Sequence, residues 1–382
     1  YNNCLEHRKT LYRDHEISIS SYDQMKELPD IKKTEDLEVY KQVGSQVLQE
    51  TIQRVDLAFQ HFFRRVKNGE TPGYPRFKGR HYYKSLTFKT AGYKFLGKGR
   101  IRLQGIGNIK FFESRPIEGK IKTVTLKRDS CGDWFIIFSC DNVEMEKLPK
   151  TGKTIGIDLG LEKFLVDDKN NQISNPRFLR KNLRNLKLEQ RKLSKKKCKG
   201  QLNKQGVPSE GKNREKQRIR VAKLHRKIAR TREDFHFKTA HYLVSNYDKI
   251  IIEDLNIQGM IENEEGNGLN KSIYDVGWAS FVQILLFKAE KAGKEVVMVD
   301  PKNTSQMCSG CGKVPEVRKT LRDRIHKCDC GTELDRDHNA ARNILDKGHQ
   351  RNSSKKNYKV WKRPLASAEE ASRHEDLRIP ML

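Results

Sequence analysis

Apolar residues alternate with small or acidic residues along 154–160, and this period of two predicts a β-strand with one packed face. The packed face consists of Ile155, Ile157 and Leu159. The opposite face carries the carboxylate of Asp158 between Gly156 and Gly160. Because glycine has no side chain, we expect these two positions to leave room for a bulky substrate beside the carboxylate.

A second strand and a helix carry two further acids. The β-branched run 250–252 predicts a strand that is buried on both faces of a parallel or mixed sheet, and Glu253 stands at its end. Residues 335–345 begin with acids and continue with apolar residues at helical spacing, which predicts a helix with Asp337 in its first turn. Between them we expect one more helix and one more strand, over 277–292 and 295–299.

The first 149 residues follow a different pattern. Apolar positions at helical spacing predict a helical region over 1–68. Residues 69–149 hold short β-prone runs separated by glycines, which predicts a small barrel or sandwich. After residue 73, aromatic and cationic side chains interleave, a pattern able to stack on bases and neutralise phosphates. The candidate nucleic-acid-binding residues in this segment are Tyr74, Arg76, Phe77, Lys78 and Arg80.

The charge of the chain is strongly positive and unevenly distributed. Its 382 residues include 77 Lys or Arg and 49 Asp or Glu, and the net charge of +28 indicates a polyanionic partner. Residues 177–232 alone hold 22 Lys or Arg against three Glu. Apolar residues recur there at helical spacing, so we expect two basic amphipathic helices joined by a flexible connection over 199–212. Candidate nucleic-acid-binding residues on these helices are Lys195, Lys196, Lys197 and Arg226.

Four of the eight cysteines fall within one short segment as two pairs on glycine-containing turns: Cys308, Cys311, Cys328 and Cys330. Four thiolates in this arrangement suit one tetrahedral Zn²⁺. The second pair encloses only Asp329, a tight spacing that leaves His326 and His338 open as substitutes for the fourth ligand. The chain shows neither a signal peptide nor an apolar run as long as a membrane span. We therefore expect reduced thiols and a cytoplasmic protein that does not bind membranes.

Asp158, Glu253 and Asp337 together indicate metal-dependent hydrolysis of a phosphodiester. Mg²⁺ is a hard ion that prefers oxygen ligands and keeps water and phosphate in its shell. Two such ions stabilise both the attacking and the leaving oxygen. Taken singly, the acids have ordinary interpretations as a salt-bridge acid, a solvated strand end and a helix cap. Their local sequences are more restrictive than the acids alone, so we expect a catalytic site that holds two Mg²⁺ ions.

Three motifs around these acids resemble the RuvC motifs of TnpB proteins, a family of transposon-encoded RNA-guided nucleases related to type V CRISPR effectors. The motifs are Gly156-Ile157-Asp158-Leu159-Gly160, Ile251-Ile252-Glu253-Asp254-Leu255 and Asp335-Arg336-Asp337-His338-Asn339-Ala340-Ala341-Arg342-Asn343-Ile344. The resemblance continues through Gly73-Tyr74-Pro75-Arg76-Phe77-Lys78, Asp275-Val276-Gly277-Trp278 and Thr304-Ser305-Gln306-Met307-Cys308-Ser309-Gly310-Cys311-Gly312. It therefore spans most of residues 60–345.

The resemblance implies a multidomain α/β protein. Residues 1–68 would form a helical recognition lobe that lacks part of its N-terminus, and residues 69–149 a β-barrel-like wedge domain. Residues 150–345 would form an RNase H-like (RuvC) nuclease domain with a zinc-ribbon insertion at 303–334. Residues 346–382 are rich in charge, and we expect a flexible tail.

The same resemblance implies an endonuclease that cuts double-stranded DNA next to a short flanking motif. A non-coding guide RNA would pair with one DNA strand, so base pairing would read the target sequence. We favour a monomer. Three alternatives are open: an RNA-guided DNA-binding repressor derived from such a nuclease, a transposase or integrase of the same superfamily, and a compact type V CRISPR effector. The three intact acids argue against the first, and their sequence contexts argue against the second.

Overall fold

Several β-sheets, each packed against helices, make up the chain, as predicted for a multidomain α/β protein. The computed structural model describes residues 1–79, 82–143, 147–196, 211–262, 269–320 and 323–350. These residues belong to two compact units, Tyr1–Glu144 and Met145–Leu382. The finer division of the chain at residues 68, 149 and 345 stays a prediction. None of the helices in the described ranges has the length and apolar content needed to cross a membrane.

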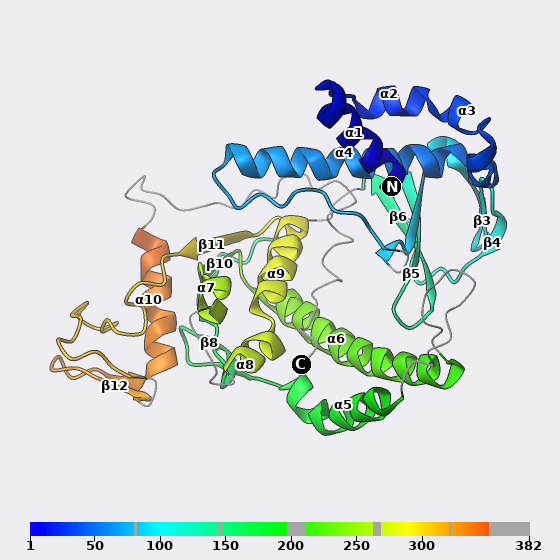
Figure 1. The fold of residues 1–382 in the computed structure, drawn as a ribbon. Helices are drawn as coiled ribbons and strands as arrows, with labels where there is room; N and C mark the ends of the chain where they lie inside the picture. The colour runs from blue at the N-terminus through cyan, green and yellow to red at the C-terminus, as the bar shows by residue number, and fades with distance from the viewer. Residues whose placement is uncertain (80–81, 144–146, 197–210, 263–268, 321–322, 351–382) are drawn as a thin grey trace. The chain divides into compact units, whose positions relative to one another are not determined.

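The first unit combines helices with two three-stranded antiparallel sheets, of orders β1-β5-β6 and β2-β3-β4 (Figure 1). Its helices are α1 (Asn2–His15), α2 (Ser21–Lys26), α3 (Leu28–Ile31), the 3₁₀ segments η1 (Glu35–Gln42) and η3 (Thr90–Gly92), and α4 (Ser45–Lys67). Its strands are β1 (Ser85–Lys89), β2 (Tyr93–Gly97), β3 (Arg100–Leu103), β4 (Gly107–Lys110), β5 (Lys120–Arg128) and β6 (Trp134–Asp141). Val47 of α4 lies in one buried core with Phe88, Ile101 and Val124 of the strands, so the long helix and both sheets fold together.

The second unit is built on a five-stranded mixed sheet of order β11-β10-β7-β8-β9. The strands are β7 (Thr154–Asp158), β8 (Lys163–Asp167), β9 (Gln172–Ser174), β10 (Lys249–Glu253) and β11 (Glu295–Val299). β7, β10 and β11 run parallel to one another, whereas β8 and β9 are antiparallel to their neighbours. β10 lies between two parallel strands and its Ile250, Ile251 and Ile252 are fully buried, which confirms the strand predicted from this β-branched run.

Helices cover both faces of this sheet. They are α5 (Phe178–Lys195), α6 (Lys212–Asn246), α7 (Ile257–Glu262), α8 (Leu269–Val276), α9 (Trp278–Ala292) and α10 (Arg336–Gln350). Ile155, Ile250 and Ile252 face a core that α6 and α9 share, while Ile251 faces Ile344 of α10 on the other side. Figure 1 shows α10 on one side of β10 and β11, and α9 with α6 on the other. A small antiparallel pair, β12 (Ile325–Lys327) and β13 (Glu333–Asp335), leads into α10.

The basic segment forms two helices, as predicted, but the second extends well beyond residue 232 to Asn246. Ala240, Leu243 and Val244 near its end are buried, so packing against the sheet sustains the helix beyond its basic part. Asp275 caps the start of the first basic helix, because its carboxylate accepts hydrogen bonds from the backbone N–H groups of Leu179 (2.8 Å) and Arg180 (3.2 Å). The predicted connection over 199–212 lies mostly outside the described residues.

A buried histidine on α6 makes the stability of this unit depend on pH. His236 is 1 % exposed, and its Nε2 lies 2.9 Å from the carbonyl oxygen of Val276. A carbonyl only accepts, so Nε2 carries the proton of the neutral ring. Burial lowers the pKa of His236 to about 4, although this hydrogen bond acts in the opposite direction.

Because the pKa is lower in the folded than in the unfolded chain, the contribution of His236 to stability is complete above pH 6.5 and is lost as the pH falls towards 4. The expected loss is about 3 kcal/mol. Calorimetric unfolding between pH 7.5 and 4.5 measures it. His236→Gln keeps a donor but does not titrate, so its transition temperature should fall less steeply over this range. Equal pH dependence in both proteins would contradict the prediction.

Candidate active site and cysteine cluster

Two of the three acids lie at the ends of neighbouring parallel strands. Ile252 of β10 is paired with Ile157 of β7, and Glu253 and Asp158 follow one residue later on each strand. Side chains alternate along a strand, so Asp158 shares the face of Gly156 and Glu253 shares the face of Ile251. Ile251 packs against α10. Both carboxylates therefore belong to the face of the sheet that α10 covers.

Gly156 allows α10 to pack directly on this face. A Cβ atom at residue 156 would lie 2.5 Å from the carbonyl oxygen of Ala341 and 2.7 Å from the backbone nitrogen of Leu345. A Cβ atom at Gly160 would lie 2.8 Å from the carbonyl oxygen of Lys163. The expectation that these glycines leave room for a substrate was therefore wrong, because the chain itself fills both positions. The consequence for the site is that Asp337, in the first turn of α10, comes close to Asp158.

The pKa of Asp158 is affected by the other two acids. Burial raises the pKa of Asp158 well above its usual value, and the negative charges of Glu253 and Asp337 raise it further. Burial also raises the pKa of Glu253, against the effect of a hydrogen bond from Thr304. Glu253 and Asp337 thus oppose the ionisation of Asp158. A bound cation would stabilise the ionised form of all three carboxylates.

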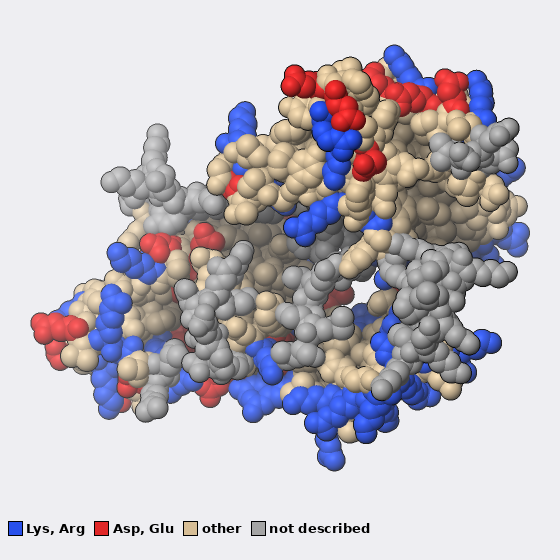
Figure 2. All heavy atoms as spheres, in the orientation of Figure 1, with Lys and Arg blue, Asp and Glu red and all other residues tan. Residues whose placement is uncertain are grey.

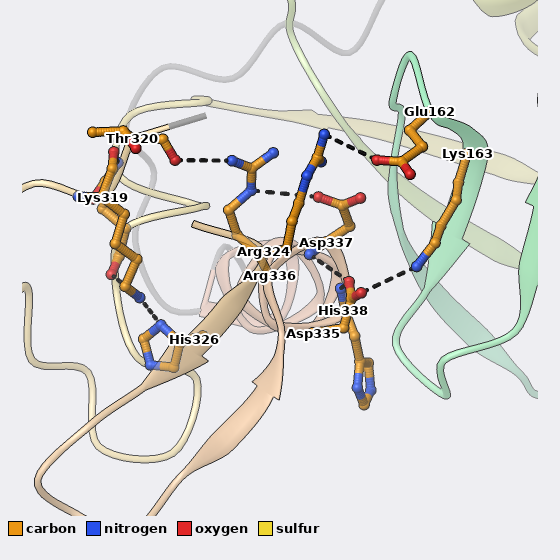
Figure 3. A network of polar contacts seen from close by, with 11 residues as sticks. Glu162, Lys163, Lys319, Thr320, Arg324, His326, Asp335, Arg336, Asp337 and His338 are labelled. Carbon is orange, nitrogen blue, oxygen red and sulfur yellow. Dashed lines mark hydrogen bonds and ion pairs between the residues drawn. The ribbon is translucent and has the colours of Figure 1, made fainter. Parts of the chain in front are cut away.

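Asp335 has a structural role at the start of α10. Its Oδ1 accepts a hydrogen bond from the backbone N–H of Asp337 (2.9 Å), and its Oδ2 pairs with Lys163 Nζ at 3.1 Å. Figure 3 shows Lys163 approaching from the β8 strand while Arg336 extends between Asp337 and Thr320. Arg336 Nε lies 3.5 Å from Asp337 Oδ1. Both acids that flank Arg336 therefore lie near a cation, but only Asp335 also caps the helix.

The four clustered cysteines come together in space. Among the described residues, the sulfur atoms of Cys308, Cys311, Cys328 and Cys330 form a group whose members all lie within 4.8 Å of one another. Within the described part of the chain, the carboxylates of Asp158, Glu253 and Asp337 do not form such a group. Although burial opposes it, N–H groups of Cys311 and Gly310 lower the pKa of Cys308 to about 6. Despite a hydrogen bond from the backbone of Lys313, the sulfurs of Cys330 and Cys328 raise the pKa of Cys311 to about 12. Four thiolates can coexist here only around a cation.

The histidines that were open as substitutes for a cysteine have other neighbours. His326 is buried, and its Nδ1 lies against Lys319 Nζ, as Figure 3 shows. His338 Nε2 lies 3.0 Å from the carbonyl oxygen of Asp168. Neither belongs to the cluster formed by the sulfurs. The short spacing around Asp329 therefore does not keep Cys330 from the other three cysteines.

Residues 307–335, which contain the four cysteines and are called the cysteine loop below, are held at their start by two asparagines of α10. Asn339 donates to the carbonyl oxygen of Met307 (2.7 Å) and accepts from the backbone N–H of Ser309 (2.9 Å). Asn343, one turn later, donates to the carbonyl oxygens of Met307 (2.7 Å) and Thr304 (2.8 Å). Both are fully buried. This function of the two asparagines was not predicted from the sequence, although their spacing of four residues on one helix face was a usable signal.

The aromatic residues predicted to bind nucleic acid lie on the surface of the first unit. Tyr74 and Phe77 are 47 % and 52 % exposed, and Lys9 Nζ lies 5.3 and 4.6 Å from their ring centroids. The rings of Phe59 and Phe62 of α4 pack edge-to-face with the ring of Tyr74. Arg76 is exposed, and Lys78 Nζ lies 4.2 Å from the ring of Tyr1. Arg80 lies outside the described residues.

Basic side chains gather on α5 and the first half of α6. Figure 2 shows Lys and Arg concentrated over the part of the surface where Figure 1 places α5. Lys195 is exposed, and Lys196 is half-buried with its Nζ donating to the carbonyl oxygen of Asn213 (3.2 Å). Arg226 is half-buried on α6. Lys197 lies outside the described residues.

Comparison with known proteins places the chain in a family. Residues 137–264 match a family model described as a probable transposase, and residues 278–344 match one described as Cas12f1-like, TNB domain. A putative RNA-guided DNA endonuclease of Streptomyces pristinaespiralis is 30% identical over 91% of this chain and 82% of its own length. The TnpB-like protein L79 of Acanthamoeba polyphaga mimivirus is 31% identical over 63% of this chain and 46% of its own length.

The fold is similar to that of a Cas12f1 protein solved by cryo-electron microscopy with sgRNA and target DNA. The TM-score is 0.53 at 17% identity, and the likeness covers 90% of this chain and 79% of that one. Together with the motifs around the three acids, these matches confirm the predicted resemblance. The chain belongs to the TnpB family of RNA-guided DNA endonucleases.

Proposed function

We propose that this protein is an RNA-guided endonuclease that cuts double-stranded DNA next to a short flanking motif, using a RuvC site formed by Asp158, Glu253 and Asp337. One observation carries the proposal. The ends of two adjacent parallel strands and the first turn of α10 place three acids so close that two of them raise the pKa of the third. The mixed five-stranded sheet that presents them supports an RNase H-like fold for this unit.

The three carboxylates fit Mg²⁺. They offer hard oxygen ligands, and their mutual repulsion is relieved by a divalent cation. A pair of bound Mg²⁺ ions would supply charge stabilisation for the attacking and leaving oxygens of the phosphodiester. Asp158 and Glu253 would hold the ions from the sheet, and Asp337 from the helix. Arg336 adds a positive charge close to Asp337, where the negative charge of the substrate phosphate would lie.

The resemblance to TnpB proteins also suggests roles for the cysteine cluster and for the first unit. The Cys308, Cys311, Cys328 and Cys330 cluster would hold one structural Zn²⁺ within a ribbon inserted before α10. The sheets of the first unit would form the wedge domain, and its helices the recognition lobe. Tyr74 and Phe77, exposed next to Lys9, have the surface that stacking on bases requires. A guide RNA would supply the sequence specificity.

The experiment that tests the function begins with the RNA that co-purifies with the protein. Sequencing it identifies the guide segment, and duplex DNA that matches this segment with a randomised flank is then incubated with the complex and Mg²⁺. We expect Mg²⁺-dependent double-strand cleavage of matched DNA and none of mismatched DNA. Tight binding of matched DNA without cutting would favour a repressor. A guide transcribed from a repeat array would favour a compact CRISPR effector.

The basic helices are expected to bind the guide RNA. Each phosphate contact removed should lower the slope of log affinity against log salt by about 0.7 on single-stranded RNA. Replacing Lys195, Lys196 and Arg226 together by glutamine should therefore reduce the slope by about 2. Filter binding at several salt concentrations measures it. The matched control neutralises Lys291, Lys313 and Lys327 on α9 and the cysteine loop. Equal slopes in the two triple variants would show that these helices are not the binding surface.

A further inference from the structure

Thr304 lies between a proposed metal ligand and the cysteine loop. Its side chain is 2 % exposed. Its hydroxyl contacts Oε1 of Glu253, which is 51 residues away in the sequence, and lies 2.8 Å from the carbonyl oxygen of Pro301. A carbonyl oxygen and an ionised carboxylate both accept only. The hydroxyl of Thr304 is therefore the donor, and the Glu253 carboxylate and the Pro301 carbonyl share its single hydrogen.

The backbone of Thr304 is fixed from the opposite side. Its carbonyl oxygen accepts a hydrogen bond from Asn343 Nδ2 at 2.8 Å, and the same amide group donates to Met307 at the start of the cysteine loop. Asn343 belongs to α10, the helix that carries Asp337. A continuous set of hydrogen bonds thus runs from Glu253 on the sheet, through Thr304, to α10 and the loop.

We propose that Thr304 is a positioning residue, which holds the Glu253 carboxylate in the orientation that binds metal and couples it to the cysteine loop. This inference rests on the proposed function. Donation to Oε1 fixes the rotation of the carboxylate and leaves Oε2 for a cation. Without the hydroxyl, the Glu253 carboxylate loses a buried hydrogen-bond donor. Its orientation then has to be fixed at the moment when metal binds, which weakens metal binding. Removing such a supporting hydrogen bond costs about 10- to 100-fold in metal affinity or activity.

The test compares variants that differ only at the hydroxyl. Thr304→Ser keeps the hydroxyl donor, and Thr304→Ala removes it in a side chain of nearly the size of serine. Thr304→Val removes the donor and keeps the shape of threonine. Mn²⁺ binding to the RNA-loaded protein is followed by electron paramagnetic resonance, and the binding that Asp158→Ala abolishes is assigned to the acids. Thr304→Ala and Thr304→Val should need about 10-fold more Mn²⁺ for half-saturation, and Thr304→Ser should resemble the wild type. Cleavage should show the same shift in its Mg²⁺ dependence.

Thr87 provides the matched control. It is another buried threonine, whose hydroxyl lies 2.9 Å from Thr125 Oγ1 in the first unit, and Thr87→Val should leave Mn²⁺ binding unchanged. Zinc content and the unfolding transition are measured for every variant, and the serine–alanine pair decides the outcome if valine prevents folding. Equal Mn²⁺ half-saturation in Thr304→Ser and Thr304→Ala would overturn the inference. Failure of the wild type to cut DNA would overturn only the proposed function, since Mn²⁺ binding is read without cleavage.

Discussion

Replacing Asp158 or Glu253 by alanine is expected to abolish cleavage of guide-matched DNA. Each substitution removes a proposed ligand from ions that stabilise both reacting oxygens. The loss should exceed the roughly 100-fold effect of removing a group that only supports a ligand. Binding of matched DNA should change little, because base pairing and backbone contacts supply the affinity. Single-turnover cleavage in Mg²⁺ and a binding titration in its absence, both with the co-purified RNA, measure the two effects.

Asp335 provides the control for this prediction. It lies two residues from Asp337, but its carboxylate caps α10 and pairs with Lys163. Asp335→Ala should therefore cost about 1 kcal/mol of stability through the lost cap. It should leave more cleavage activity than Asp337→Ala, because the ligand set stays complete. An Asp158→Ala protein that cuts matched DNA at the wild-type rate would refute the assignment of the site.

Local sequence patterns predicted the elements that carry the acids. The alternation around Asp158 and the β-branched run before Glu253 gave strands that agree with β7 and β10. These predictions succeeded because both strands lie inside the sheet, where apolar and β-branched residues are buried. The clustering of Cys330 with the other cysteines was also readable, although its short spacing left two histidines open as alternatives.

Interactions between distant segments could not be read in this way. A glycine beside an acid is compatible with an open site or with a close helix, and only the fold shows that α10 fills the space at Gly156. The extension of α6 to Asn246 depends on a sheet face that it covers. The contact of Thr304 with Glu253 joins residues 51 positions apart, and no periodicity within either segment indicates it. The three acids could therefore be predicted from the sequence, whereas the residues that support them could not.

The cysteine loop is connected to the acids through buried amides. Asn339 holds Met307 and Ser309 on either side of Cys308, and Asn343 holds Thr304, which contacts Glu253. Glu162 and Lys163, where β8 begins, form ion pairs with Arg324 and Asp335 of the same loop. Order in the loop is therefore linked to the position of α10 and of two acids.

Purified protein is accordingly expected to contain one tightly bound Zn²⁺ per chain, and loss of this ion should remove most of the cleavage activity. A structural Zn²⁺ contributes its binding energy to folding of the segment that holds it. Without the ion, hydrogen bonds with the sulfurs of Cys330 and Cys328 raise the pKa of Cys311 to about 12, against a backbone hydrogen bond from Lys313, so the four thiols do not ionise together. Elemental analysis measures the content, and hydrogen exchange of residues 336–343 reports whether the start of α10 loosens when zinc is removed.

Cys330→Ser tests the ligand that the sequence left open, with Cys140→Ser, outside the cluster, as the matched control. The Cys330 variant should lose zinc, expose the amides of α10 to exchange and cut DNA poorly, whereas the Cys140 variant should resemble the wild type. If Cys330→Ser kept its full zinc content while His326→Asn or His338→Asn lost zinc, the fourth ligand would be that histidine instead of Cys330. A wild-type content below roughly a quarter equivalent, in protein purified without chelator, would exclude a structural zinc site altogether.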